Sequence, residues 1–540
     1  MKVAILDGYV DEPSCLGVPP YVAPYPRYIY GMLKHFGINA EYVTIDQFRG
    51  NDELRKRIED FDLVIVISGV AVPGKYLGGN PLSLKELRFL FPREKPEKKV
   101  LVGPIVLEMD RKDRRALEHY VIIDFPFEAE LFEYLTDLFG ERDIKFSIDR
   151  FAVIGAEVVR KHPDFPHIIC EIETYRGCYW RKCSFCIERI HGKPKMREPE
   201  WVIKEIEALY RQGVRHFRLG RQTDFLTYMA DFRFDVPKPN PEFMRNLHRE
   251  IWRRCPRIKT LHLDNVNPKT IAEHPEESRE IIKTIVLYQT PGNVAAMGLE
   301  SADERVIELN NLASTPEDAM FAIELINRYG RYVGYNGLPY FLPGINFVAG
   351  LKGETKETFE KNYGFLQEVY ERGLLLRRIN IRQVKIVKGT PMEKFGTRNV
   401  ERHKKYFKIF KGRVRTQIDN AMLKKIVPVG RKITDLRCEV REGKITFARQ
   451  LATYPLLVGL VGEYERNTYL DARVVGYGMR SITAVPTLNV NTARLYQLEA
   501  IPGIGKAMAA RIVANRPYKS IDELKKIISN FDDVKDYLSV

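Results

Sequence analysis

Short apolar runs alternate with amphipathic stretches over much of the chain. Near the N-terminus, residues 3–6, 63–68 and 100–103 are mainly apolar, whereas 27–35 has the spacing of a helix. Short apolar runs separated by helical stretches are typical of strands in a parallel sheet that is covered on both faces. The pattern therefore predicts a Rossmann-like α/β domain over residues 1–148.

The same alternation continues over residues 149–400. Six candidate strands lie at 167–174, 215–220, 260–265, 294–299, 344–349 and 378–384. Six βα units make most of a barrel, and enzymes of that architecture carry their chemistry at the carboxyl ends of the strands. We therefore expect a partial (β/α)6 barrel in this region.

From residue 401 the pattern changes twice. Residues 401–425 hold nine Lys or Arg and two acids, which predicts a basic helical linker. Residues 426–487 then alternate polar and apolar positions in short runs, which predicts a small β-barrel. The expected strands of this barrel are 433–439, 444–448, 456–462 and 469–475. Residues 488–540 return to helical spacing.

Composition gives this multidomain α/β chain a basic surface. The 540 residues carry 86 Lys and Arg against 71 acids, a formal net charge of +15, which favours polyanionic partners. A heat-adapted surface rich in Lys and Glu is the alternative explanation. No apolar run approaches the ~20 residues that span a bilayer. We therefore expect a cytoplasmic protein with no membrane partner.

Three of the seven cysteines, Cys178, Cys183 and Cys186, lie just after the first strand of the predicted (β/α)6 barrel. Three thiolates can hold three irons of a [4Fe–4S] cluster and leave the fourth iron open. The run Cys183-x2-Cys186-x4-His191 also has zinc-knuckle spacing, with Cys178 as a fourth ligand. Packed thiols without a ligand are the third alternative. The cysteine spacing alone leaves the iron–sulfur and zinc hypotheses open.

The order of motifs downstream resembles that of the radical SAM superfamily. A glycine turn at 220–223 follows the second strand, and a polar segment at 297–307 includes the end of the fourth. The segments 347–355 and 387–392 resemble the fifth and sixth strand motifs. The resemblance covers about residues 165–395, although four residues separate the first two cysteines where usual members have three.

This resemblance implies a [4Fe–4S] cluster, held by Cys178, Cys183 and Cys186, and S-adenosylmethionine (SAM) as cofactors. The residues that it implies for SAM contact are Phe185, Gly220, Arg221, Gln222, Thr223, Glu300, Ser301 and Gly350. Members of the superfamily cleave SAM reductively to a 5′-deoxyadenosyl radical, which removes hydrogen from a substrate. The resemblance therefore also implies a one-electron donor such as ferredoxin.

The N-terminal region does not indicate either of two specialised branches of the superfamily. Cobalamin-binding members carry an Asp-x-His-x-x-Gly motif there, and this chain has no histidine before His35. Methylthiotransferases hold a second cluster with three N-terminal cysteines, and this chain has Cys15 alone before residue 150. We therefore expect one cluster and no cobalamin.

The C-terminal segment resembles a helix-hairpin-helix motif. In the run Ile-Pro-Gly-Ile-Gly-Lys, Gly503 and Gly505 allow a tight turn and expose backbone N–H groups at the start of the next helix, a natural phosphate site. Lys506 and Arg511 would add positive charge. The small barrel at 426–487 resembles the OB-fold or the TRAM barrel of methylthiotransferases, which bind nucleic acid. A purely structural role is the alternative for both modules.

The complete order of domains resembles a group of archaeal radical SAM proteins with a C-terminal helix-hairpin-helix. The leading hypothesis is a radical SAM enzyme that modifies RNA, with tRNA as its partner. One alternative is a radical SAM enzyme that acts on a protein or a small molecule. A zinc-stabilised nucleic-acid-binding protein is the other.

Overall fold

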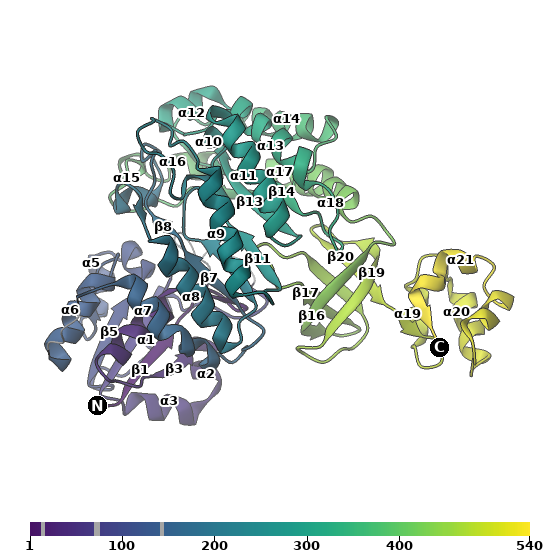
Figure 1. Ribbon diagram of the computed structural model, residues 1–540, viewed down its shortest axis with the longest axis horizontal. Coiled ribbons are helices and arrows are strands. Elements are labelled where there is room, and N and C mark those ends of the chain that lie inside the picture. Colours follow the sequence, from purple (N-terminus) through teal and green to yellow (C-terminus); the bar gives the residue numbers. More distant parts are fainter. Residues whose placement is uncertain (12–16, 70–75, 141–144) are drawn as a thin grey trace.

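The computed structural model describes residues 1–11, 17–69, 76–140 and 145–540, so Cys15 lies outside the described residues. Four parts are visible in Figure 1. The N-terminal α/β domain (purple) lies below a larger unit of parallel strands and helices (teal), the small β-barrel (green) lies to one side, and the C-terminal helices (yellow) stand at the far end. The expected multidomain α/β fold is confirmed.

A five-stranded parallel sheet forms the centre of the N-terminal domain. Its order is β3-β1-β4-β5-β6, a doubly wound arrangement of the flavodoxin type. The strands are β1 Val3–Asp7, β3 Glu41–Thr44, β4 Leu63–Ile67, β5 Lys98–Val102 and β6 Val121–Ile122. Every residue of β1 and β4 is buried, which explains their nearly unbroken apolar sequence.

The six strands expected in residues 149–400 are present and parallel. They form the orders β11-β10-β7 and β12-β13-β14-β15, and Asp264 separates β11 from β12. The strands are β7 Ile169–Glu173, β10 His216–Gly220, β11 Thr260–Leu263, β12 Asn265–Val266, β13 Asn293–Glu300, β14 Phe341–Ala349 and β15 Ile379–Gln383. The longer helices between them are α8 Pro199–Gln212, α9 Pro241–Arg254, α11 Pro275–Tyr288, α13 Pro316–Gly330 and α14 Lys356–Glu371.

The N-terminal domain and this unit share one hydrophobic core. The short strand β2 (Tyr21–Val22) leaves the N-terminal domain and pairs in parallel with β7, with Tyr21 opposite Ile169. Helix α1 (Tyr25–His35) packs on α7 (Ile148–Ile154), which in turn contacts α8. Buried residues of all these elements belong to one continuous apolar cluster. The two units are therefore packed as one body.

Residues 404–426 are helical, as expected for the basic linker, in α17 (Lys404–Arg413), a π-helical stretch at 414–419 and α18 (Asn420–Ile426). The small barrel that follows is closed in the order β16-β17-β18-β20-β19. Its strands are β16 Lys432–Glu442, β17 Ile445–Arg449, β18 Leu457–Val461, β19 Tyr469–Tyr477 and β20 Ser481–Pro486. A five-stranded closed barrel of this kind is the architecture of the OB-fold.

The C-terminal module consists of short helices around a small core. Helix α19 (Leu495–Glu499) and helix α20 (Lys506–Ala514) form the hairpin, and β21 (Leu488–Asn489) pairs with β22 (Leu538–Ser539). Val461 and Val485 of the barrel contribute to the same apolar cluster. No helix among the described residues is both long and apolar enough to cross a membrane.

Candidate functional site

The three cysteines lie in a loop that begins directly after β7 and β8 (Tyr175–Arg176). Nearby backbone N–H groups favour the thiolate form of each cysteine: those of Trp180 and Arg181 at Cys178, that of Ala313 at Cys183, and that of Glu188 at Cys186. N–H groups close to cysteine sulfurs also tune the potential of iron–sulfur clusters. The donor set and its backbone support therefore fit a cluster held by three cysteines.

Burial raises the pKa of all three thiols. The pKa of Cys183 is raised to about 12, and the nearby Cys178 and Glu300 add to the effect of burial. Burial also raises the pKa of Cys178, and it raises that of Cys186 well above the ordinary value, with Cys183 adding to the effect there. Ionisation of all three thiols in this buried loop is therefore favoured only when a positive charge is close to them, and a bound metal supplies such a charge.

The zinc hypothesis requires four donors around a single ion at about 2.3 Å from each sulfur. Among the described residues, no three Cys, His, Asp or Glu side chains converge in a way that could hold one metal ion. The ring of His191, one of the four donors of this hypothesis, packs against Phe125 of the N-terminal domain at 5.5 Å between centroids. Burial lowers the pKa of His191 to about 3. The geometry gives the zinc-knuckle alternative no support.

The glycine turn after β10 lies against the cysteine loop. The Thr223 hydroxyl donates to the carbonyl of Gly177 at 3.2 Å, and Thr223 lies close enough to Cys178 to lower the pKa of its thiol, against the larger effect of burial. Arg221 has a φ of +65°, a conformation that is strained for a residue with a side chain. A Cβ at Gly220 would lie 2.2 Å from Oε1 of Glu171, so this position requires glycine.

Two residues of the predicted SAM site, Gln222 and Ser301, have buried side chains that bond to nearby groups of the chain. The Gln222 side chain is buried, accepts from the Thr174 hydroxyl at 3.2 Å and donates to the carbonyl of Leu219 at 2.9 Å. Ser301 is also buried, and its hydroxyl accepts from the N–H of Asp303 at 3.1 Å. Both side chains therefore hold local backbone in place.

The remaining residues of the predicted SAM site gather at the carboxyl ends of β13 and β14. Glu300, with a φ of +65°, lies close enough to raise the pKa of Cys183. Phe185 packs in a small apolar cluster with Cys183 and Leu312. Gly350 has a φ of +93°, and its N–H donates to Glu354 at 2.7 Å. The residues expected from scattered motifs thus lie at one end of the strands.

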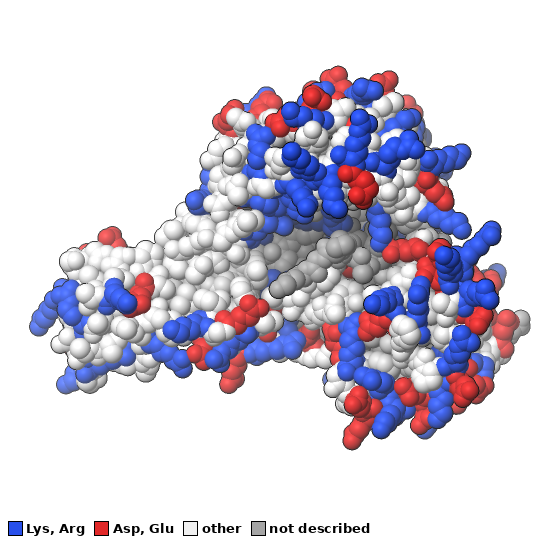
Figure 2. All heavy atoms as spheres, turned by 180° about the vertical axis from the view of Figure 1, so that it is seen from behind, with Lys and Arg blue, Asp and Glu red and all other residues white. Residues whose placement is uncertain are grey.

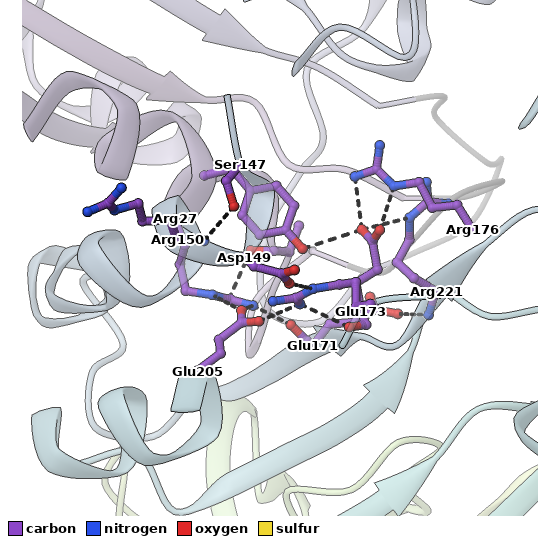
Figure 3. Close-up of polar contacts among 12 residues, drawn as sticks. Arg27, Ser147, Asp149, Arg150, Glu171, Glu173, Arg176, Glu205 and Arg221 are labelled. Atoms are coloured by element: carbon purple, nitrogen blue, oxygen red, sulfur yellow. Dashed lines mark hydrogen bonds and ion pairs between the residues drawn. The ribbon is translucent and has the colours of Figure 1, made fainter. Parts of the chain in front are cut away.

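A buried ion network, which sequence reasoning missed, lies beneath this end (Figure 3). Arg27 of α1 is fully buried and pairs with Glu205 of α8 at 2.8 Å. Glu205 also pairs with Arg197 at 2.6 Å, and Arg197 donates to the carbonyl of Glu173 at 3.0 Å. The network therefore joins the N-terminal domain to β7 through side chains that water does not reach.

Glu173 is the centre of the second half of this network. Arg176 pairs with Glu173 at 2.6 Å and with Glu128 of the N-terminal domain at 2.5 Å, and Arg221 lies 3.8 Å from Glu173. Burial alone would raise the pKa of Glu173, but these arginines outweigh it and lower the pKa to about 2. The sequence signal was the alternation of Glu171 and Glu173 with apolar residues in a strand.

Sequence reasoning also missed the loop that closes the amino-terminal end of the strands. The floor loop, residues 450–456, leaves the small barrel between β17 and β18 and reaches β11. The Thr260 hydroxyl donates to the carbonyl of Leu451 at 2.7 Å. The N–H of Thr453 donates to Nδ1 of His262 at 3.2 Å, which leaves Nε2 of His262 to donate to the carbonyl of Thr290 at 3.0 Å.

Tyr454 of the floor loop connects to the glycine turn through a chain of polar contacts. Its hydroxyl donates to Asp264, and Asp264 pairs with Arg218 at 2.6 Å. Arg218 lies 3.2 Å from Glu171, whose Oε1 accepts the N–H of Arg221 at 3.1 Å. A loop of the small barrel is thus linked to the turn that contacts the cysteine loop.

The predicted nucleic-acid residues of the C-terminal module lie on its surface. Gly503 has a φ of +92°, and Gly505, with open space at its Cβ position, precedes the first residue of α20, Lys506. Gly503, Gly505, Lys506 and Arg511 are all exposed. Backbone N–H groups and Lys506 therefore face solvent at the start of α20, and Arg511 faces solvent in its last turn.

Comparison with known proteins agrees with this arrangement. The model of the radical SAM superfamily matches residues 172–366, and that of the helix-hairpin-helix motif matches 484–529. An uncharacterised protein of Archaeoglobus fulgidus is 66% identical over 531 residues, which cover 98% of this chain and 97% of that protein. An uncharacterised protein of Methanocaldococcus jannaschii is 44% identical over 509 residues, which cover 89% of this chain and 92% of that protein. The chain belongs to the radical SAM superfamily, and its cofactors are a [4Fe–4S] cluster and SAM.

More distant similarities cover part of the chain or the fold alone. The ribosomal protein uS12 methylthiotransferase RimO of Thermodesulfovibrio yellowstonii is 25% identical over 199 residues, 37% of this chain and 41% of that protein. Among solved structures, the radical SAM methyltransferase TsrM of Kitasatospora setae, with cobalamin and a [4Fe–4S] cluster bound, has a TM-score of 0.49 and 16% identity. That match covers 73% of this chain and 77% of TsrM.

Proposed function

We propose that this protein is a radical SAM enzyme that modifies RNA, with tRNA as its substrate. The observation that carries this proposal is the floor loop. A barrel of OB architecture, followed by a helix-hairpin-helix motif, extends this loop into the amino-terminal end of the parallel strands, where Tyr454 begins the chain of polar contacts that reaches the glycine turn. A module suited to nucleic acid is therefore linked through the interior of the strands to the turn beside the cysteine loop rather than only tethered to the chain.

The proposed roles follow from the placement of the residues. Cys178, Cys183 and Cys186 bind the cluster. The proposed SAM contacts are Phe185, Gly220, Arg221, Gln222, Thr223, Glu300, Ser301 and Gly350. When bound, the cluster and SAM supply an electron and a 5′-deoxyadenosyl radical, and a donor such as ferredoxin replaces the electron.

The chain's own residues orient the cofactors and exclude water from them. Thr223 fixes the glycine turn against the cysteine loop through the Gly177 carbonyl. The backbone N–H groups of Trp180, Arg181 and Glu188 favour the thiolate form of the cysteines. In the C-terminal module, Gly503, Gly505, Lys506 and Arg511 bind phosphates of the RNA, which positions the substrate without reading its sequence.

The decisive experiment compares modified nucleosides in tRNA from cells with and without this gene, by mass spectrometry. We expect one modified nucleoside to be missing and to return with the wild-type gene but not with Cys183→Ala. An unchanged set of nucleosides would overturn the RNA assignment. Anaerobic reconstitution should give about four irons per chain and 5′-deoxyadenosine on reduction with SAM; a protein that binds zinc alone would overturn the whole proposal.

A protein substrate is the second candidate, because the RimO relatives are named for their action on a ribosomal protein. Those relatives match this chain over less than half of its length. Intact-mass analysis of ribosomal proteins from the same two strains distinguishes the candidates. A missing mass on a ribosomal protein together with unchanged tRNA would favour this candidate.

A further inference from the structure

The strand β15 forms one edge of the parallel unit, since it pairs with β14 and ends the sheet. The sequence around this strand is strongly basic. Residues 373–392 contain five Lys or Arg and no acid. Edge strands are commonly protected by single charged residues. Here several arginines lie close together, at the start of β15 and in the neighbouring part of the small barrel.

This place is the arginine cluster, defined as Arg377, Arg378, Arg415 and Arg480. Arg377 donates to the carbonyl of Tyr454 at 3.4 Å, and the guanidinium of Arg378 lies 4.0 Å from the Tyr454 ring centre. Arg415 donates to the carbonyl of Ile379 at 2.8 Å. The cluster therefore joins the start of β15, the π-helical stretch and the floor loop.

Asp419 is the carboxylate found with this cluster among the described residues. It pairs with Arg415 and lies 3.7 Å from Arg480, whereas no ion pair of Arg377 or Arg378 is present in the described part of the chain. Burial, followed by the charges of Arg480 and Arg378, lowers the pKa of Arg377 to about 10. Burial and Arg415 lower the pKa of Arg480 and of the neighbouring Lys411.

The backbone at this place is also strained. Arg378 has a φ of +74°, a region that residues with side chains rarely occupy. In this conformation its side chain donates to Asn346 of β14 at 3.2 Å and lies over Tyr454. Strain that the surrounding structure maintains, together with repulsion between cations, is typical of a site prepared for a ligand of opposite charge.

We propose that the arginine cluster binds a backbone phosphate of the RNA substrate at the junction of β15 and the small barrel. This inference rests on the proposed RNA substrate and adds a second phosphate contact, distant in sequence from the helix-hairpin-helix motif. Guanidinium groups suit phosphate because they donate paired hydrogen bonds to it. Figure 2 shows Lys and Arg gathered above a hollow on the face of the molecule opposite to that of Figure 1, and positive charge on a surface attracts polyanions.

The test measures binding of bulk tRNA to the reconstituted holoenzyme over a series of KCl concentrations. The variant Arg377→Gln/Arg480→Gln removes two charges and leaves Arg378 and Arg415, whose contacts support the backbone. The matched control, Arg249→Gln/Arg257→Gln, removes two charges from exposed positions in and just after α9. Arg480→Gln alone, at an exposed turn, serves if the double variant fails to fold.

The cluster variant should bind tRNA at least about tenfold more weakly at moderate salt, and its log–log salt slope should be less steep by about 0.7, the contribution of one single-strand phosphate contact. The control should keep the wild-type affinity and slope. Wild-type values for the cluster variants would overturn the inference and leave the RNA proposal standing. A wild-type protein that binds no tRNA would overturn the RNA proposal itself, and binding of polyglutamate instead would assign the cluster to a protein anion.

Discussion

At the scale of single residues, Tyr454 holds the floor loop to the strands. Its hydroxyl donates to Asp264, which also pairs with Arg218, and its ring lies against Arg378. Hydrogen bonds to charged groups stabilise a fold by about 1.5–3 kcal/mol, more than bonds between neutral groups. One hydroxyl therefore makes a measurable contribution to the contact between two domains.

Tyr454→Phe should lower the free energy of unfolding of the holoenzyme by about 1.5–3 kcal/mol, because Asp264 loses a donor in a buried site. Chemical denaturation followed by fluorescence measures this loss. Tyr335→Phe is the matched control, since the Tyr335 side chain is 68% exposed, and it should cause no measurable change. Equal effects of the two substitutions would contradict the role of Tyr454.

The low pKa of Glu173 predicts that the free energy of unfolding depends on pH. Its pKa falls from an ordinary 4.5 to about 2, so its ionised form stabilises the folded state fully above pH 4.5 and progressively less as pH falls towards 2. Glu173→Gln should therefore cost about 3 kcal/mol of unfolding free energy at pH 7. The difference from wild type should shrink between pH 4.5 and 2 in guanidinium titrations. A difference that stays constant over this range would disprove the assignment.

At the scale of elements, the turn between α19 and α20 depends on two glycines in different ways. Gly503 has a φ of +92°, and a Cβ there would lie 2.3 Å from the side-chain nitrogen of Asn530. Gly505 has a φ of −80°, and no atom lies within 4 Å of its Cβ position. The first glycine is required by the fold, and the second is compatible with a side chain.

Gly503→Ala should destabilise the C-terminal module by about 1–3 kcal/mol, because alanine is strained at this φ and meets Asn530. Gly505→Ala is the matched control and should leave its stability unchanged. Amide hydrogen exchange in α20 measures both effects. If Gly505→Ala exposes α20 as much as Gly503→Ala does, the geometric explanation is wrong.

At the scale of the whole molecule, the two C-terminal modules are attached differently. The helix-hairpin-helix stands at the end of the molecule and packs on the barrel through Val461 and Val485 (Figure 1). The barrel is attached more firmly, because its floor loop supplies hydrogen-bond partners for Thr260 and His262. Loss of the barrel would remove one hydrogen-bond partner from each of these buried side chains.

A chain truncated after residue 487 should keep its iron content and most of its thermal stability, and should bind tRNA more weakly. A chain truncated after residue 425 loses the floor loop and should unfold at a clearly lower temperature. Calorimetry together with iron analysis separates the two cases. Equal thermal stability of both truncated chains would show that the floor loop does not support the strands.

The sequence by itself determined the architecture and predicted the centre of the candidate site. Strand and helix periods are local, so the apolar runs at 63–68 and 260–265 predicted strands that the structure contains. The sequence also predicted that the cysteines and the glycine turn lie close together, because the carboxyl ends of parallel strands meet at one edge. The barrel expectation missed one strand, β20, which is defined by its pairing with β18 and β19.

Only the tertiary structure decided how the parts are joined. The pairing of β2 with β7 and the bond from Tyr21 to the carbonyl of Ala452 connect segments up to 431 residues apart. The arginine cluster likewise combines residues just before β15, from the π-helical stretch and from a barrel turn. Local sequence patterns do not predict such contacts, because burial and charge pairing arise only when distant segments pack together.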